Sequence, residues 1–272
     1  MPKVVFWNEN NNMNNSTDVA IAVSNLISIK YKTKSILMQT NLENRKIESA
    51  FTPYDELKAS GTFENRDIGI GALLKTIISN KLTSTVIKNY AKPVLKDRLD
   101  IMYGIFSGEI EQYNLMLKNL QYITLKADEI YDLVFIDLAS GTDNKDIEPV
   151  LKDADIIVYV LDQDGIKLED YLLSLKDNKY LKDKQVILAI GNYDERSKYN
   201  VTNIRKKYRI KEPIYTVPSN YIFKDSMNDG LVIDFFYKNL NAEKIDYNGK
   251  FINETNNIVQ KVIELSKIKD YE

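Results

Sequence analysis

The side chains available for chemistry in this 272-residue chain are carboxylates, lysines, tyrosines and hydroxyls, because it contains no histidine and no cysteine. Lack of histidine removes the commonest general base and the commonest transition-metal ligand. Lack of cysteine excludes disulfides, thiolate nucleophiles and thiolate-bound metals. Any functional site is therefore restricted to the remaining side chains and to backbone amides.

Polar residues of these kinds follow several short apolar runs. Asn8–Thr17 follows the first run and leads into a helical pattern, and a later run ends at Asp137, before Leu-Ala-Ser-Gly141. Two further runs lead into Asn192-Tyr193-Asp194 and into Pro218-Ser219-Asn220. If the runs are parallel strands, their carboxyl ends meet at one sheet edge, where α/β proteins bind ligands. We expect one functional site made from these loops.

The elements that must position these loops alternate along the chain. Continuous apolar runs indicate strands covered on both faces, and the segments between them have helical periodicity. This alternation predicts an α/β fold with a doubly wound, mostly parallel sheet flanked by helices. The candidate strands are Val4–Trp7, Ser35–Gln39, Leu99–Tyr103, Leu133–Asp137, Ile156–Leu161, Val186–Ile190 and Ile214–Val217. The clearest candidate helices are Asp18–Ile29, Gly69–Asn80, Glu109–Lys126 and Ile166–Leu175.

Composition and charge set further limits. With 44% hydrophobic and 28% charged residues and no linker or repeat, residues 1–272 are expected to form a single domain. The formal charge of −2 gives no global basic field for nucleic acid. No window approaches the roughly 20 apolar residues that a membrane span needs, and the first residues do not look like a signal peptide. We expect a cytoplasmic protein without direct membrane insertion, recruited to a membrane or cell pole only by a partner.

Over nearly its whole length the chain resembles the ParA/MinD family of deviant P-loop ATPases. Tyr131–Gly141 resembles the strand that carries the magnesium-site aspartate, here Asp137, and the switch loop after it. Asn192 matches the base-contacting asparagine, and Pro218 lies in a loop resembling the one that closes over the adenine. Leu82–Gly104 is most similar to the TadZ/CpaE-type branch of pilus and secretion localisation proteins. The resemblance implies a P-loop NTPase-like fold and a nucleotide site at these positions.

The phosphate loop of that family reads K-G-G-x-G-K-T-[ST], and this chain lacks its lysines and glycines. The matching positions are Asn10, Asn11, Asn12, Met13, Asn14, Asn15, Ser16 and Thr17, so asparagine replaces both lysines and all three glycines. Glycines let the backbone approach phosphate, and the lysines neutralise phosphate charge. Removing one such charge-stabilising group can cost roughly 3–4 kcal/mol in a transition state. The second strand also ends in Met38–Asn41, without the family's water-positioning aspartate.

These losses predict a pseudo-ATPase with no catalytic residue, no resident cofactor and no bound metal. Ser16 and Asp137 are then vestigial magnesium positions, and 8–17 is a degenerate phosphate loop. Asp137 could equally serve as a structural cap at the end of its strand. Two alternatives stay open: a loop that still holds ATP or ADP with Mg²⁺ weakly, and an ATPase with an unorthodox loop.

Two further segments have a functional and a structural interpretation. Ile204–Lys211 contains five cations and could contact DNA or an acidic partner, but the exposed end of a helix is favoured. The apolar spacing across about 251–269 predicts a C-terminal helix. Its mixed polar face favours packing against the sheet over membrane binding.

The leading hypothesis is a catalytically degenerate ParA/MinD-like protein that localises or scaffolds a membrane-associated machine. By resemblance this is a Tad-type pilus, a secretion system or a conjugation system, and its components are the expected partners. The family dimerises across its nucleotide site, so a homodimer is expected. The alternatives are a ParA-like plasmid or DNA partition protein, and a nucleotide-binding protein with an unorthodox P-loop.

Overall fold

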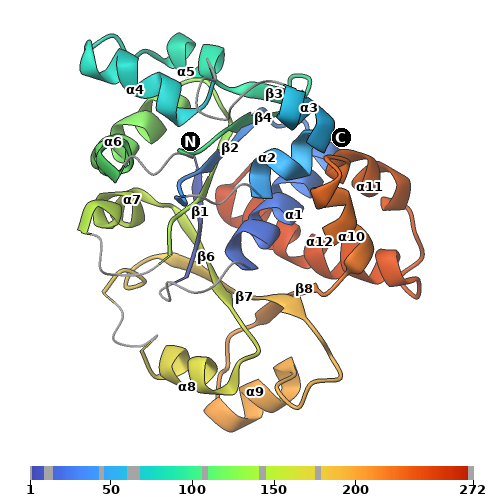
Figure 1. The fold of residues 1–272 in the computed structure, drawn as a ribbon. Coiled ribbons are helices and arrows are strands. Elements are labelled where there is room, and N and C mark those ends of the chain that lie inside the picture. Colours follow the sequence, from blue (N-terminus) through green and yellow to red (C-terminus); the bar gives the residue numbers. More distant parts are fainter. Residues whose placement is uncertain are drawn as a thin grey trace.

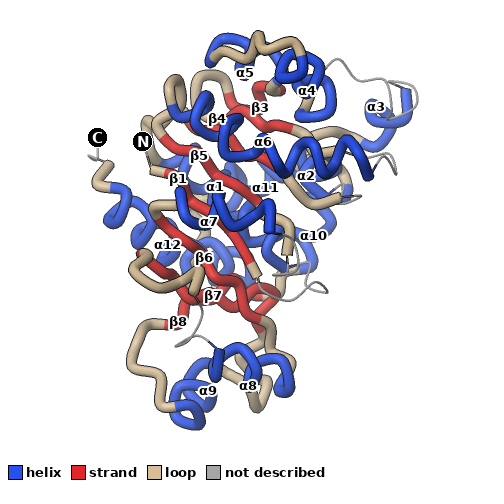
Figure 2. Tube along the Cα trace, turned by 90° about the vertical axis from the view of Figure 1, so that its left-hand side faces the viewer, coloured by secondary structure: helices blue, strands red, loops and turns tan. Residues whose placement is uncertain are grey.

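A computed structural model describes residues 2–8, 15–42, 46–59, 68–105, 110–140, 145–174 and 179–268. Within them an eight-stranded sheet has the order β3-β4-β2-β5-β1-β6-β7-β8. All neighbours pair in parallel except β3 and β4, which are antiparallel. The strands are β1 (Lys3–Trp7), β2 (Ser35–Gln39), β3 (Lys92–Leu95), β4 (Leu99–Met102), β5 (Leu133–Asp137), β6 (Ile156–Leu161), β7 (Gln185–Tyr193) and β8 (Ile214–Pro218). Figure 2 shows them as a twisted ladder between helices. The predicted doubly wound, mostly parallel fold is confirmed.

Helices cover both faces of the sheet (Figure 1). One face packs against α1 (Asn15–Lys30), α2 (Lys46–Phe51), α10 (Tyr221–Asn228), α11 (Val232–Asn239) and α12 (Tyr247–Ser266). The other packs against α4 (Ile70–Ile78), α5 (Ser84–Tyr90), α6 (Ile110–Asp128), α7 (Glu148–Asp153), α8 (Gly165–Ser174) and α9 (Val201–Tyr208). The short α3 (Tyr54–Ala59) follows α2, and the 3-10 helix η1 (Lys145–Ile147) precedes α7.

The central strands form because their interior residues are apolar and are buried on both faces, whereas polar residues such as Lys3, Gln39 and Asp137 lie at strand ends. In β1, Val4 and Phe6 belong to the core under α1 and α12, whereas Val5 and Trp7 belong to the core under α6 and α8. The strand lies between β5 and β6, with Phe6 opposite Asp137. The carboxyl ends of β2, β5 and β1 are therefore neighbours, which places their loops together.

The candidate strands all form, with ends that differ by a residue or a few. β3 was not among them: it is a four-residue edge strand containing Pro93, and its partly exposed residues give no apolar run. The helix α12 begins at Tyr247, earlier than the expected start near residue 251, because Tyr247–Lys250 add a turn without apolar periodicity. Phe251, Ile258 and Val262 are buried in the core, so the tail helix packs against the sheet as favoured.

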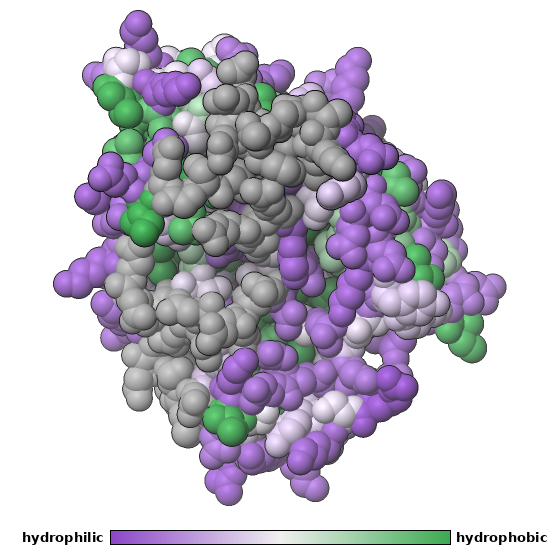
Figure 3. Space-filling model, viewed as in Figure 1, coloured by the Kyte–Doolittle hydropathy of each residue, from purple (hydrophilic) through white to green (hydrophobic). Residues whose placement is uncertain are grey.

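The described surface is largely hydrophilic. Figure 3 shows polar residues over most of the described part of one face, with separate hydrophobic areas near α4–α6 and α11. Within the described residues, no helix has the length and hydrophobicity needed to cross a bilayer.

Candidate functional site

Asp137 ends β5 in the centre of the sheet and is fully buried. The Ser16 hydroxyl donates to its Oδ1 at 3.3 Å, and the Thr17 hydroxyl donates to its Oδ2 at 2.7 Å. Both hydroxyls lie in the first turn of α1, which follows β1, the strand next to β5. The parallel pairing of β1 with β5 therefore places the start of α1, which follows β1 in the chain, beside the end of β5.

A third donor reaches Asp137 from the loop after β2. The Asn41 side-chain amide Nδ2 donates to Oδ2 at 3.0 Å. The preceding Thr40 fixes this loop, since its backbone N–H and its hydroxyl both donate to the Asp137 carbonyl, at 3.1 and 3.0 Å. The Thr40 hydroxyl also accepts from the Ala139 N–H at 2.8 Å. The loops after β2 and β5 are thus joined by four hydrogen bonds that position Asn41 against the carboxylate.

Burial raises the pKa of Asp137 to about 6. The hydrogen bonds from Thr17, Asn41 and Ser16 act in the opposite direction, and the nearby Asp18 carboxylate raises the pKa further. Asp18 has its own cation, the Lys46 ammonium at 2.8 Å. Every side-chain donor to Asp137 in the described part of the chain is neutral, so above its pKa the carboxylate is stabilised by dipoles and not by a cationic side chain.

Gln39 lies beside Asp137 on β2, in register with it, and is also fully buried. Neither polar atom of its side-chain amide has a hydrogen-bond partner among the described residues. Such a group costs about 1–3 kcal/mol. The sequence indicated only that a carboxylate is missing here; nothing in it predicted an unpaired buried amide.

Asn192 and Pro218 meet at the neighbouring strands β7 and β8. Asn192 has a left-handed backbone (φ 51°), and its side-chain Oδ1 accepts from the Lys224 ammonium at 2.7 Å. Pro218 ends β8 opposite Tyr193, and the Ser219 N–H donates to the Tyr193 carbonyl at 2.8 Å. A cation of the same chain therefore occupies the acceptor that resemblance assigns to a nucleotide base. Lys224 was not predicted.

The start of α1 links the residues around Asp137 to those around Asn192 and Pro218. A Cβ added to Gly191 would lie 2.9 Å from Asn15 Cβ, so only glycine lets β7 approach α1 this closely. Asn15, at the position of the family's loop lysine, is next to Ser16 and Thr17, which bond Asp137. The structure thus brings together Asn15, Ser16, Thr17, Asp137, Asn192 and Pro218 at the carboxyl edge. The predicted positions Asn10, Asn11, Asn12, Asn14 and Gly141 lie outside the described residues.

No family model matches this sequence, and no curated protein matches it. Several solved structures are similar to this chain. A ParA family ATPase from Chlorobium tepidum TLS has a TM-score of 0.71 at 11% identity, covering 95% of this chain and 98% of its own. MinD from Pyrococcus horikoshii OT3, complexed with Mg-ADP, has a TM-score of 0.65 at 13% identity, covering 98% and 100%.

The fold is that of the ParA/MinD ATPases. A Borrelia burgdorferi B31 protein assigned to plasmid partition and bound to AMPPNP has a TM-score of 0.63 at 15% identity, covering 98% of this chain and 100% of its own. Identities this low establish the ParA/MinD-like fold and leave the chemistry to this chain's own residues.

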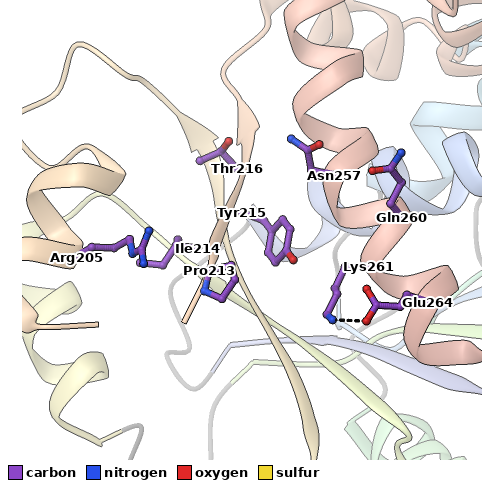
Figure 4. Close-up of a pocket in the computed structure, with 9 residues that line it drawn as sticks. All are labelled: Arg205, Pro213, Ile214, Tyr215, Thr216, Asn257, Gln260, Lys261 and Glu264. Atoms are coloured by element: carbon purple, nitrogen blue, oxygen red, sulfur yellow. Dashed lines mark hydrogen bonds and ion pairs between the residues drawn. The ribbon is translucent and has the colours of Figure 1, made fainter. Parts of the chain in front are cut away.

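A surface groove of about 430 Å³ lies away from Asp137, between β8, α9 and α12. Figure 4 shows Arg205 on one side and Asn257, Gln260, Lys261 and Glu264 on the other. Lys261 and Glu264 form an ion pair at 2.7 Å, so two of the lining charges neutralise one another. A neighbouring hollow of about 390 Å³ shares Gln260 and Glu264.

Proposed function

We propose that this protein is a pseudo-ATPase with a ParA/MinD-like fold, and that it acts by protein contacts and not by turnover. The observation that carries the proposal is the donor set around Asp137: two hydroxyls and one amide, all neutral. Phosphoryl transfer depends almost entirely on positioned positive charge. The described side chains that contact Asp137 are neutral dipoles, and the two nearby lysines, Lys46 and Lys224, contact Asp18 and Asn192 instead.

The residues present do not fit a magnesium ion. Mg²⁺ requires oxygen ligands in near-ideal octahedral geometry. Asp137 Oδ2 already accepts two hydrogen bonds, and Asn41 directs N–H groups, which cannot ligate a cation, at that oxygen. We therefore assign no magnesium-dependent step to this chain.

We propose a localisation or scaffolding role at a membrane-associated machine such as a Tad-type pilus, a secretion system or a conjugation system. The resemblance of Leu82–Gly104 to TadZ/CpaE-type proteins supports this role. An Aquifex aeolicus structure of the same fold is a MinC:MinD complex, which illustrates a partner-bound form. The chain is proposed to act as a cytoplasmic homodimer, recruited to its site by a partner.

The test is calorimetry of ATP and ADP with Mg²⁺, with hydrolysis followed in the same preparation. The expected result is no turnover and no binding up to millimolar nucleotide. Hydrolysis above a blank without protein contradicts the proposal. Affinity purification with pilus, secretion and conjugation components then tests the scaffolding role, and failure to retain any of them contradicts it. Sedimentation without nucleotide tests the homodimer.

A DNA partition role is the second candidate, favoured by the Borrelia burgdorferi neighbour. The basic segment that could contact DNA is the end of α9, as favoured from the sequence. Lys207 pairs with Glu169 at 3.2 Å, and Arg205 donates to the carbonyls of Ile210 and Lys211. DNA binding that weakens steeply with salt supports partition, because phosphate contacts release counterions. Absence of binding at low salt excludes it.

A further inference from the structure

We infer that the Asn41 side-chain amide takes the place of a divalent cation against Asp137, so that the carboxyl edge keeps one arrangement without metal or nucleotide. This inference rests on the proposed pseudo-ATPase function and adds the residue that makes the edge independent of metal. It concerns the contact between the loop after β2 and the end of β5. Thr40, Asn41 and Asp137, which make this contact, all lie within the described residues.

The contact has the polarity that a cation contact would have. Asn41 Nδ2 lies 3.0 Å from Asp137 Oδ2, and the Thr17 hydroxyl donates to the same oxygen at 2.7 Å. An ionised carboxylate only accepts hydrogen bonds, so the amide must present its NH₂ group and not its oxygen. The amide therefore contributes partial positive charge at the carboxylate.

The amide is aimed by its neighbours and is not a freely rotating surface group. Thr40, one residue earlier, makes two hydrogen bonds to the Asp137 carbonyl and one to Ala139. These bonds fix the backbone from which the Asn41 side chain projects. The second carboxylate nearby, Asp18, is neutralised by Lys46. The Asp137 and Asp18 carboxylates thus both have partners from this chain's own side chains.

Exchanging the amide for a carboxylate of the same shape reverses this polarity. In Asn41→Asp, two carboxylates face each other where the natural chain has the hydrogen bond from Asn41 to Asp137. Like charges so close cannot both be ionised without a counter-ion. A proton shared between the two carboxylates relieves the repulsion at low pH, so at neutral to alkaline pH the variant is expected to need a divalent cation, whereas the natural chain is not. The reciprocal variant Asn41→Asp/Asp137→Asn returns one amide and one carboxylate to the contact with their positions exchanged.

The experiment is thermal unfolding of the full chain in EDTA and in millimolar Mg²⁺, Mn²⁺ or Ca²⁺, without nucleotide. The natural chain is expected to have the same Tm in all four conditions. Asn41→Asp is expected to lower Tm in EDTA by roughly 5 °C and to recover it in at least one divalent cation. The reciprocal variant is expected to regain most of the Tm in EDTA. Asn241→Asp, in an exposed turn, is the matched control for the added charge.

Several outcomes overturn the inference. One is a natural chain stabilised by several degrees in a divalent cation, which means that the amide does not replace metal. Another is an Asn41→Asp variant that no cation restores, which makes the contact a packing effect. If Asn41→Asp does not fold, two measurements on the natural chain still test the inference. These are the response of its Tm to divalent cations and its direct titration with Mn²⁺ alone. Nucleotide is absent from all of these measurements. A failure of this inference can therefore be distinguished from a failure of the proposed function, which is tested by ATP turnover.

Discussion

Replacing Asp137 by asparagine tests the electrostatics of the candidate site through the pH dependence of stability. Burial raises the pKa of Asp137 from 3.8 to about 6 in the folded chain. Between these values the folded state binds more protons than the unfolded state. This carboxyl group therefore contributes stability that is fully present below about pH 4 and is lost as pH rises through 6. A rise of about 2 in pKa corresponds to about 3 kcal/mol.

The quantity to measure is the free energy of urea unfolding of the natural chain minus that of Asp137→Asn, from pH 4 to pH 7.5. Other titrating groups affect both proteins and cancel in the difference. The natural chain is expected to lose about 2.5 kcal/mol relative to the variant over this range, with most of the change between pH 4 and 6. The exposed Asp225→Asn serves as the control and should give a nearly constant difference.

A difference for Asp137→Asn that stays constant over the range, or that grows in favour of the natural chain as pH rises, refutes the reasoning. The second result would mean that the three hydrogen bonds outweigh burial and depress the pKa. In that case the carboxylate is stabilised as an anion far more strongly than its surroundings indicate. The sign of the slope thus decides whether burial or the donor set dominates.

The remaining predictions concern stability and are read by urea unfolding. Thr17→Val removes the shortest bond to Asp137 and should cost about 1.5–3 kcal/mol, because hydrogen bonds to charged groups are worth that much; a loss below 0.5 kcal/mol contradicts it. Gly230→Ala should cost more than about 1 kcal/mol, since φ is +73° and the new Cβ would lie 2.3 Å from the Pro53 nitrogen; a neutral result contradicts this packing of α10 on α2. Ile258→Ala should cost about 2–5 kcal/mol if α12 packs on the sheet, whereas Ile245→Ala, at a side chain 88% exposed, should cost under about 0.5 kcal/mol; equal costs contradict it.

The central fold could be predicted from the sequence because burial on both faces leaves apolar residues at the interior positions of the central strands. β6, Ile156–Leu161, is a continuous apolar run and is buried at all six residues. The edge strand β3 lacks that signal, since Lys92 and Pro93 suit a strand with one free side. Helix starts such as Tyr247 are equally hard to predict, because a first turn can be polar throughout.

Only part of the site could be predicted, because some of its contacting residues are far apart in the sequence. Ser16, Thr17 and Asp137 follow from the ends of neighbouring parallel strands and from the resemblance. Asn41 is separated from Asp137 by 96 positions, and Lys224 is 32 positions from Asn192. Whether such side chains point at each other depends on the path of each loop, which residue types do not determine.

The donor set around Asp137 explains how a buried carboxylate can persist at the centre of the sheet without a cation. Desolvation disfavours the anion, but each hydrogen bond to a charged group offsets about 1.5–3 kcal/mol of that penalty. The three donors come from two segments, the first turn of α1 and the loop after β2, and meet at the end of β5. An apolar residue at position 137 would avoid the burial penalty and would lose all three connections. Asp137 therefore makes the relative position of these two segments depend on side-chain hydrogen bonds.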